Sequence, residues 1–230
     1  FPPLSVTKNK LVLFREKHPL LFQSGVVCFS TLMFFLLLDT FFPVRVNIQY
    51  STIVTANDGT VLYSFLSPDD KWRMKTELPE IIPALKSAVV AKEDRWFYWH
   101  YGVNPVAIVR AAFNNIIHQR TTSGASTITM QVARLLEPKD RTFWNKITET
   151  FRAVQLELHY SKNEILQMYL NLVPFGGNVE GVKAASLLYF GRLPDHLSLA
   201  QITALTIIPN RPTSLALGKN NHLIQKERNK

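Results

Sequence analysis

A short stretch around two adjacent carboxylates holds the densest set of reactive side chains in the sequence. Residues 92–102 read Lys-Glu-Asp-Arg-Trp-Phe-Tyr-Trp-His-Tyr-Gly, so Glu93 and Asp94 stand beside several aromatic rings and His100. Aromatic rings that exclude water from a carboxyl group raise its pKa and fit it for general acid or base catalysis near neutral pH. Sites that join or cleave sugars use such a carboxyl group. The alternative is a helix end with an aromatic core patch.

A second stretch, residues 123–134, runs from small and hydroxylated residues into a predicted helix over 127–136. The backbone N–H groups and positive end of a helix N-terminus suit an anion such as a phosphate. Thr127 lies at this helix start, with Ser126 before it. Ordinary N-capping explains the hydroxyl groups equally well.

A third stretch, Arg141 to Glu149, lies in a predicted amphipathic helix over 142–159. Apolar residues recur at helical spacing there and predict its packing stripe: Phe143, Ile147, Phe151, Val154 and Leu158. Glu149 lies about 200° around the helix from Ile147, so it is expected to point away from that stripe, with Lys146 as its neighbour. The alternative interpretation is a solvated surface ion pair.

The segment that precedes these stretches predicts a membrane anchor. Residues 19–38 carry no charge and are mostly apolar, which is enough to cross a hydrocarbon core of roughly 30 Å. A cleaved signal peptide is the alternative, but its apolar region is usually only about 7–15 residues long and ends in small residues. Four cations precede the segment, Lys8, Lys10, Arg15 and Lys17, so the N-terminus is expected in the cytoplasm and the rest outside.

The remaining patterns predict a small hairpin and a helical body. Two strand-like runs, 51–56 and 60–65, flank Asn57-Asp58-Gly59. Asn104 and Pro105 open one helix, and capping boxes at 161–164 and 198–201 open two others. Residues 174–178 must form a turn.

Composition narrows the classes of function. The net charge of +9 implies an anionic partner: nucleic acid, phospholipid or a phosphorylated substrate. Cys28 is the one cysteine of the sequence, which excludes an intrachain disulfide and a cysteine-based zinc site. Phosphate-loop, dinucleotide-binding and His-Glu-x-x-His motifs do not occur in the sequence.

Taken in order, the stretches resemble glycosyltransferase family 51, the peptidoglycan glycosyltransferases. The matching blocks are Glu93-Asp94-x-x-Phe97-x-x-His100-x-Gly102, Gly124-x-Ser126-Thr127-Ile128-Thr129-x-Gln131, Lys146-x-x-Glu149, Ser161-Lys162-x-Glu164-Ile165-Leu166-x-x-Tyr169-Leu170-Asn171, and Phe175-Gly176-Gly177-Asn178-x-Glu180-Gly181-Val182 with Tyr189-Phe190-Gly191. The resemblance covers roughly residues 80–212. Lys71-Trp72-Arg73, Thr129-Met130-Gln131 and residues 174–178 are similar to the C subtype of class A penicillin-binding proteins, which normally continue into a transpeptidase domain.

The resemblance implies a mainly α, lysozyme-like domain on the membrane, preceded by one transmembrane helix and a short β-hairpin stalk. The expected parts are a cytoplasmic basic tail (1–18), a transmembrane anchor (19–43), a stalk (44–79), a glycosyltransferase domain (80–215) and the start of a linker (216–230) to a further domain. The body is expected on the outer side of a bacterial inner membrane.

The resemblance also assigns roles to residues. Glu93 would be the general base that acts on lipid II as acceptor, and Glu149 the second acidic residue near the leaving pyrophosphate. The residues expected to contact pyrophosphate and sugar are Thr127, Gln131, Arg134, Arg141 and Lys146. Those expected to shape the site are Asp94, Phe97, His100 and Ser126. A divalent cation, Mg²⁺ or Mn²⁺, is compatible with Glu149, and no organic cofactor is expected.

Three residues depart from the family pattern: Met130 and Asn145 replace a usual glutamine and arginine, and Arg134 replaces a common lysine. The loss of a cation at Asn145 would weaken pyrophosphate binding. Competing functions are a glycan hydrolase on the same fold and a non-catalytic scaffold that binds lipid II or other cell-wall synthesis proteins. Nucleic-acid binding conflicts with the predicted topology.

Overall fold

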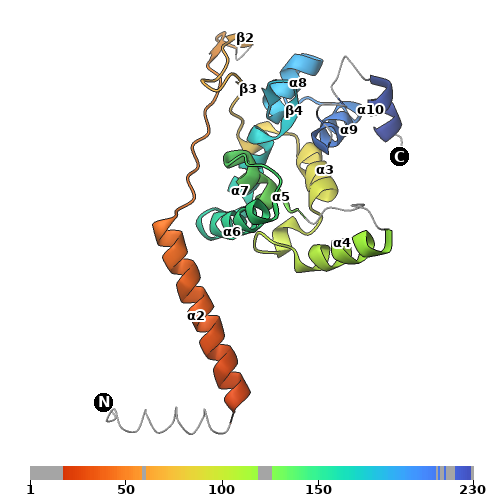
Figure 1. The fold of residues 1–230 in the computed structure, drawn as a ribbon. Coiled ribbons are helices and arrows are strands. Elements are labelled where there is room, and N and C mark those ends of the chain that lie inside the picture. Colours follow the sequence, from red (N-terminus) through yellow and green to blue (C-terminus); the bar gives the residue numbers. More distant parts are fainter. Residues whose placement is uncertain are drawn as a thin grey trace. The chain divides into compact units, whose positions relative to one another are not determined.

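The computed structural model describes residues 18–58, 61–118, 126–210, 212, 215 and 221–228 (Figure 1). The chain divides into two units, residues 1–44 and 45–230. In the first unit, helix α2 (Pro19–Phe41) has 23 residues and starts with a proline at its first turn. Its rise of about 1.5 Å per residue gives about 35 Å, enough to cross a bilayer core. Within the described residues it is the one helix long and apolar enough to span a membrane.

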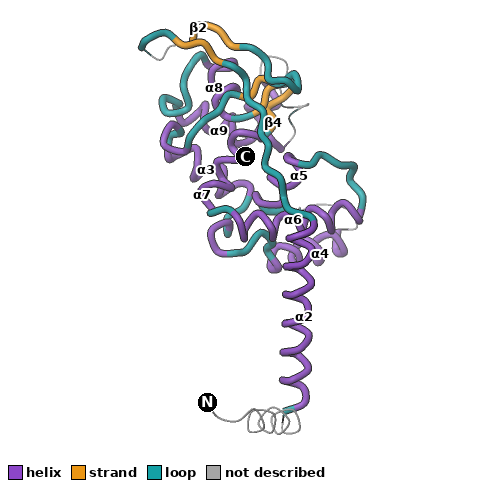
Figure 2. The backbone as a smooth tube through the Cα atoms, turned by 90° about the vertical axis from the view of Figure 1, so that its left-hand side faces the viewer, coloured by secondary structure: helices purple, strands orange, loops and turns teal. Residues whose placement is uncertain are grey.

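The second unit is mostly helical, as predicted, and Figure 2 shows its few strands gathered at one end. The helices are α3 (Pro83–Glu93), α4 (Pro105–His118), α5 (Ile128–Leu136), α6 (Phe143–His159), α7 (Lys162–Leu172), α8 (Val182–Phe190), α9 (Leu199–Ile207) and α10 (Asn221–Arg228). Short 3₁₀ turns lie at Leu78–Glu80, Phe97–Trp99 and Ile208–Asn210.

The strands form two small sheets. β1 (Ile53–Thr55) and β2 (Val61–Ser64) pair antiparallel, which confirms the predicted hairpin; Gly59 of its turn lies outside the described residues. β3 (Trp72–Arg73) runs parallel to β5 (Val179–Glu180), and β4 (Pro174–Gly176) pairs antiparallel with β5. The predicted turn is therefore the β4–β5 connection, and β3 joins a strand more than a hundred residues further along.

Local capping rules explain where several helices begin. Ser161 and Ser198 form the predicted capping boxes with Glu164 and Gln201. Asn104 Oδ1 accepts a hydrogen bond from the N–H of Ala107 at 3.0 Å, so α4 starts at Pro105 as expected. A side chain that satisfies a free N–H at a helix start contributes about 1 kcal/mol.

The core lies where α5 packs against α6 and α7, and where α3 packs against α9. Its largest fully buried side chains include Tyr169, Phe97, Phe175, Ile128, Leu156 and Leu170. These packed helices fix the positions of the motifs described above.

The packing face predicted for α6 is wrong. Phe143, Ile147 and Leu158 are 76%, 46% and 57% exposed, and the buried residues of the helix are Ala153, Gln155 and Leu156. The spacing of apolar residues shows that a helix has an apolar face, but not what covers that face. The buried face of α6 is built from one small, one polar and one large apolar residue instead: Ala153, Gln155 and Leu156.

Candidate active site

Glu93 is the last residue of α3, and its carboxylate is held from α5. Gln131 Nε2 donates a hydrogen bond to Glu93 Oε2 at 3.0 Å. The other oxygen, Oε1, is buried and has no hydrogen-bond partner among the described residues. One oxygen of the carboxylate is therefore fixed, while the other keeps its capacity to accept a proton.

Asp94 is buried and links the end of α3 to the start of α5. Its carboxylate oxygens lie 2.9 and 3.1 Å from Nε2 of His100, and Oδ2 also accepts from the N–H of Ile128 at 3.1 Å. The anion at the α5 N-terminus is thus a carboxylate of the protein itself. Asp94 and Thr127 already take two N–H groups at this helix start, and the phosphate site expected there stays a prediction.

The aromatic rings expected to shield the carboxylate are mostly exposed to solvent. Phe97 is fully buried, but Trp96, Tyr98, Trp99 and Tyr101 are 56%, 52%, 81% and 82% exposed. The 3₁₀ turn at 97–99 points these rings outward.

Gly102 allows this loop to lie against α5 and α6. Thr127 Oγ1 donates to the carbonyl oxygen of Gly102 at 2.6 Å and accepts from the N–H of Met130 at 3.1 Å. A Cβ at Gly102 would lie 2.7 Å from the carbonyl oxygen of Ala153, and the φ of Gly102 is +77°. Only glycine fits this approach and this backbone angle without strain.

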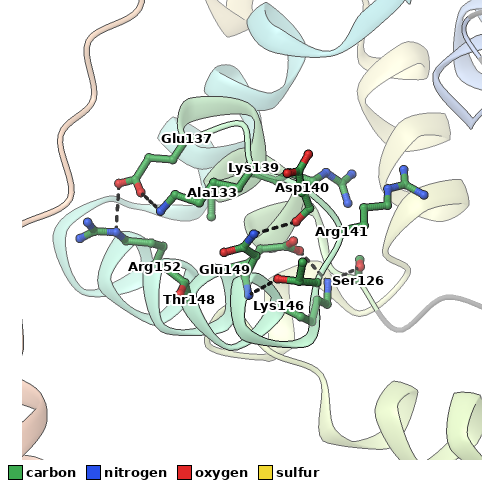
Figure 3. Close-up of a pocket in the computed structure, with 13 residues that line it drawn as sticks. Ser126, Ala133, Glu137, Lys139, Asp140, Arg141, Lys146, Thr148, Glu149 and Arg152 are labelled. Carbon is green, nitrogen blue, oxygen red and sulfur yellow. Dashed lines mark hydrogen bonds and ion pairs between the residues drawn. The ribbon is translucent and has the colours of Figure 1, made fainter.

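A basic pocket of about 340 Å³ lies between α5, α6 and the loop that joins them (Figure 3). Five cations line it: Arg134, Lys139, Arg141, Lys146 and Arg152. Three carboxylates line it as well: Glu137, Asp140 and Glu149. The excess of cations suits a ligand that carries more than one negative charge.

Lys146 connects two predicted site residues in this pocket. Its Nζ lies 2.7 Å from Ser126 Oγ and 2.7 Å from Glu149 Oε1. The Glu149 side chain is only 10% exposed, so the pair is not the solvated surface pair of the alternative interpretation. The predicted i, i+3 neighbourhood of the two residues is confirmed.

Glu137, Lys139 and Arg152 were not singled out from the sequence. Figure 3 shows Glu137 between the other two, with ion pairs of 3.0 Å to Lys139 Nζ and 3.0 Å to Arg152 Nε. Arg152 follows Asn145 by seven residues, which is two helical turns, so both residues lie on the same face of α6. That spacing is the pattern from which the sequence could have predicted Arg152 in this site. Asn145 itself lines the pocket, and its amide donates to the carbonyl oxygen of Asp140 at 2.9 Å.

A second cavity of about 340 Å³ contains Glu93. It is lined from α4 by Val106, Ala107 and Arg110, and from the α3 end by residues 91–96. Ser126 and Thr127 complete it, and Ser126 also lines the basic pocket. The two cavities therefore share Ser126, with one predicted acidic residue in each.

Arg134 and Arg141, both predicted to contact the pyrophosphate, line the basic pocket without a hydrogen bond or ion pair to another described residue. Gln131 lies at Glu93, and Phe97 lies in the core below the loop. The predicted residues thus gather around two adjoining cavities.

The described residues contain no group of three His, Cys, Asp or Glu side chains that could hold a metal ion. Mg²⁺ in phosphate sites often uses one or two carboxylates and completes its shell with phosphate oxygens and water. Glu149 offers one such carboxylate, so the pocket fits a cation that arrives with a phosphorylated ligand.

The body is thus helical, with a part-buried glutamate, Glu93, in one cavity and a basic pocket beside it. The family model described as Transglycosylase matches residues 58–230. The chain belongs to this family, glycosyltransferase family 51, and carries the glycosyltransferase domain of class A penicillin-binding proteins.

Relatives of known name agree with this assignment. The chain is 43% identical to penicillin-binding protein 1C of Escherichia coli over 77% of its length and 23% of that protein. It is 37% identical to penicillin-binding protein 1A of the same organism, over 74% of this chain and 20% of that protein. It is 34% identical to penicillin-binding protein 4 of Bacillus subtilis, over 73% and 27% respectively. The chain thus spans about a quarter of the length of these relatives or less.

Proposed function

We propose that this chain polymerises lipid II into glycan strands, with the acceptor sugar in the Glu93 cavity and the donor pyrophosphate in the basic pocket. The proposal rests on one observation: Ser126 lines both cavities, so the two cavities adjoin. Two substrates that exchange a sugar must meet at one point, and the cavities adjoin there with a base on one side and cations on the other.

The reaction follows from these positions. Glu93 removes the proton from the 4-hydroxyl of the acceptor as that oxygen attacks the anomeric carbon of the donor. The bond from the anomeric carbon to the pyrophosphate oxygen breaks, the carbon inverts, and the electron pair leaves on undecaprenyl pyrophosphate. A proton acceptor placed within hydrogen-bond reach contributes about 10²–10⁴-fold to such a step.

The basic pocket stabilises the charge that develops on the leaving group. Arg134 and Arg141 have no partner among the described residues, and Lys146 is held between Ser126 and Glu149. Cations that are already oriented need no rearrangement during the reaction. A divalent cation, held by Glu149 and the pyrophosphate, would add charge neutralisation there.

Exposed apolar side chains support a body that lies on the lipid surface. Val106, Val109 and Phe113 of α4 are 74%, 69% and 65% exposed, and Phe143 and Trp144 of α6 are 76% and 75% exposed. Both helices lie at the end of the body opposite the strands (Figures 1 and 2). Large exposed apolar patches mark contacts with membranes or proteins, and a lipid-linked substrate requires the first. The basic residues before α2 support a cytoplasmic N-terminus.

A glycan hydrolase on the same fold is the competing function. Its substrate carries no pyrophosphate, so it has no use for the five cations of the basic pocket. A scaffold that binds lipid II without turnover would use the cations but not the part-buried carboxylate of Glu93.

The test is incubation of the detergent-solubilised chain with labelled lipid II and Mg²⁺, followed by separation of products by size. We expect polymer from the parent chain, none from Glu93→Gln, and parent-like polymer from Glu77→Gln, whose exposed glutamate lines neither cavity. Shortened glycan from an added sacculus would favour the hydrolase. Retained lipid II binding without polymer from the parent would favour the scaffold.

A further inference from the structure

A groove that the scheme above does not use runs along one face of α3. Its volume is about 590 Å³, larger than either cavity of the site. From α3 it is lined by Pro83, Lys86, Ser87, Val90 and Ala91. This spacing of three and four residues places side chains on one face of a helix. From first to last these positions span about 12 Å, at a rise of about 1.5 Å per residue.

The opposite wall of the groove comes from other segments. Leu78 and Pro79 line it from the 3₁₀ turn before α3, and Asn163 and Leu166 line it from α7. Tyr98, which is 52% exposed, adds an aromatic ring from the 3₁₀ turn that follows α3. The groove therefore has mostly apolar walls, supported by two helices and two short turns.

Two cations line the groove, and none of the described residues that line it is a carboxylate. Lys86 Nζ donates to the carbonyl oxygen of Leu78 at 2.9 Å, so the ammonium group is held at the groove and keeps two further donors. Arg95 makes no hydrogen bond or ion pair to another described residue, so its guanidinium group can receive a carboxylate. Apolar walls with an excess of positive charge suit a ligand that carries both apolar groups and carboxylates.

The groove adjoins the Glu93 cavity. Ala91 and Arg95 line both spaces, so the two meet at the last turn of α3. Val106 and Arg110 of α4 line the cavity but not the groove. From the cavity, the groove therefore follows α3 back toward its first turn, without α4.

We propose that this groove binds the acidic peptide of the acceptor lipid II. The inference rests on the proposed function, which puts the acceptor sugar in the Glu93 cavity. The muramyl sugar of lipid II carries a short peptide with free carboxylates, and a sugar bound in the cavity brings that peptide to the point where the groove begins. Three or four extended residues, at about 3.3 Å each, match the 12 Å face of α3. Arg95 and Lys86 pair with the carboxylates, and the apolar walls contact the aliphatic side chains.

The lipid chain of the acceptor is the other apolar part of the substrate. It carries no charge, so in this groove it would cover Lys86 and Arg95 without pairing with either of them. Taking unpaired charges out of water is unfavourable. The two cations therefore favour the peptide as the occupant.

The experiment measures KM for lipid II as acceptor, with a preformed lipid-linked glycan as donor. Two forms of lipid II are compared, one with free peptide carboxylates and one with the same carboxylates converted to amides. Ser87 is exposed, so Ser87→Glu and Ser87→Lys change the charge of the groove, and both new residues favour a helix more than serine does. Ala84→Glu is the matched control, because Ala84 is exposed on α3 but lines neither the groove nor the Glu93 cavity.

A carboxylate at position 87 competes with the peptide for Lys86 and Arg95. With free carboxylates on the lipid, we expect Ser87→Glu to raise KM about threefold and Ser87→Lys to lower it about threefold, the effect of one exposed charge pair. These changes should fade at high salt, and kcat should stay at the parent value. Ala84→Glu should keep the parent KM, and the KM for the amidated lipid should not depend on the charge at position 87.

Two results would overturn the inference. One is the same KM change, or none, for the acidic and the amidated lipid; the other is an equal effect of Ala84→Glu and Ser87→Glu. Either would leave the groove to another occupant, such as an apolar segment of a partner protein. The proposed function survives such a failure if the parent makes polymer and Glu93→Gln does not. If the parent makes no polymer from either lipid, the proposed function and the inference both fall.

Discussion

The two acidic residues of the site differ in the partners that hold them. Glu93 receives one amide hydrogen bond from Gln131, whereas Glu149 is paired with the charged Lys146. The amide leaves Glu93 Oε1 without a partner among the described residues, whereas Glu149 Oε1 already accepts from a cation. These partners agree with the proposal that Glu93 is the base and that Glu149 lies near the leaving group.

This difference makes Lys146 the cation whose loss should harm the reaction most. Lys146→Met removes a charge from the basic pocket and leaves the nearly buried Glu149 without its partner. We expect polymerisation to fall by about 10²-fold, because an oriented charge at the leaving group is worth several kcal/mol. The comparison is Lys139→Met, which removes a half-exposed cation of the same pocket.

Initial rates from labelled lipid II would measure both variants. Lys139→Met should cost only a few-fold. Equal losses in the two variants would mean that the pocket acts through its total charge and that the position of Lys146 is unimportant.

At the scale of elements, the site depends on a loop clamped between helices. Asp94 and Thr127 satisfy the first N–H groups of α5, Thr127 also binds the carbonyl of Gly102, and Lys162 Nζ donates to the carbonyl of His100. These bonds fix the segment from Glu93 to Gly102 against α5 and α7. Glu93 is therefore placed by helices distant in sequence.

Gly102→Ala should break this clamp. The new Cβ would lie 2.7 Å from a backbone oxygen of α6, at a φ of +77°. We expect the free energy of unfolding to fall by about 2–3 kcal/mol, with a loss of polymerisation. Gly177→Ala is the matched control, since its φ is +57° but no atom lies within 4 Å of the new Cβ.

Chemical denaturation followed by circular dichroism would compare the two glycine variants. Gly177→Ala should lose only about 1 kcal/mol and keep the parent activity. A loss at Gly102 no larger than at Gly177 would show that the loop moves away from α6 at little cost.

At the scale of the whole molecule, Arg73 of β3 is a buried arginine that links segments distant in sequence, among them the chain before β1 and strand β5. Arg73 donates to Glu180 Oε2 and Asp69 Oδ2, and to the carbonyl oxygen of Gln49 at 2.6 Å. Its side chain is 8% exposed, so these partners compensate a charge that would otherwise be costly to bury. The boundary predicted between stalk and catalytic domain at 79/80 stays a prediction, although β3 pairs with β5 across it.

Asp69 makes part of this connection dependent on pH. Burial raises its pKa, but hydrogen bonds from Ser67 and Arg73 outweigh that effect, so the pKa of Asp69 is lowered on folding. A lowered pKa adds stability above the unfolded value near 4, and this stability is lost as the pH falls through the folded value. Since the side chain is 44% exposed, we expect only about 0.5 kcal/mol.

The measurement compares unfolding of the parent and Asp69→Asn between pH 7 and pH 3. The parent should be the more stable at pH 7, and the difference should vanish toward pH 3. A difference that persists at pH 3 would mean that Asp69 acts through its shape or hydrogen bonds alone.

Local rules explain which features could be predicted. Helix starts at Asn104, Ser161 and Ser198 depend on a few neighbouring residues, so the sequence predicts them directly. The three-stranded sheet joins strands of two or three residues that lie far apart in the chain, and no periodic pattern predicts strands this short. The outward α6 face was misjudged because apolar spacing cannot distinguish a face that packs on the core from one that is exposed.

The site was predictable to the extent that its residues lie in recognisable blocks. Gln131 lies in such a block, but its hydrogen bond to Glu93 depends on how α5 lies beside the end of α3. Glu137 and Arg152 belong to no block of the resemblance. Their place in the basic pocket follows from the loop between α5 and α6, whose path the sequence does not specify.

The most direct test of the central claim is the ratio of undecaprenyl pyrophosphate released to glycosidic bonds formed, measured together as lipid II is consumed. We predict a ratio of about one for the parent chain and neither product from Glu93→Gln, because the base and the leaving group act in one displacement. Pyrophosphate release without a new bond, or polymer formed at the parent rate by Glu93→Gln, would contradict the account.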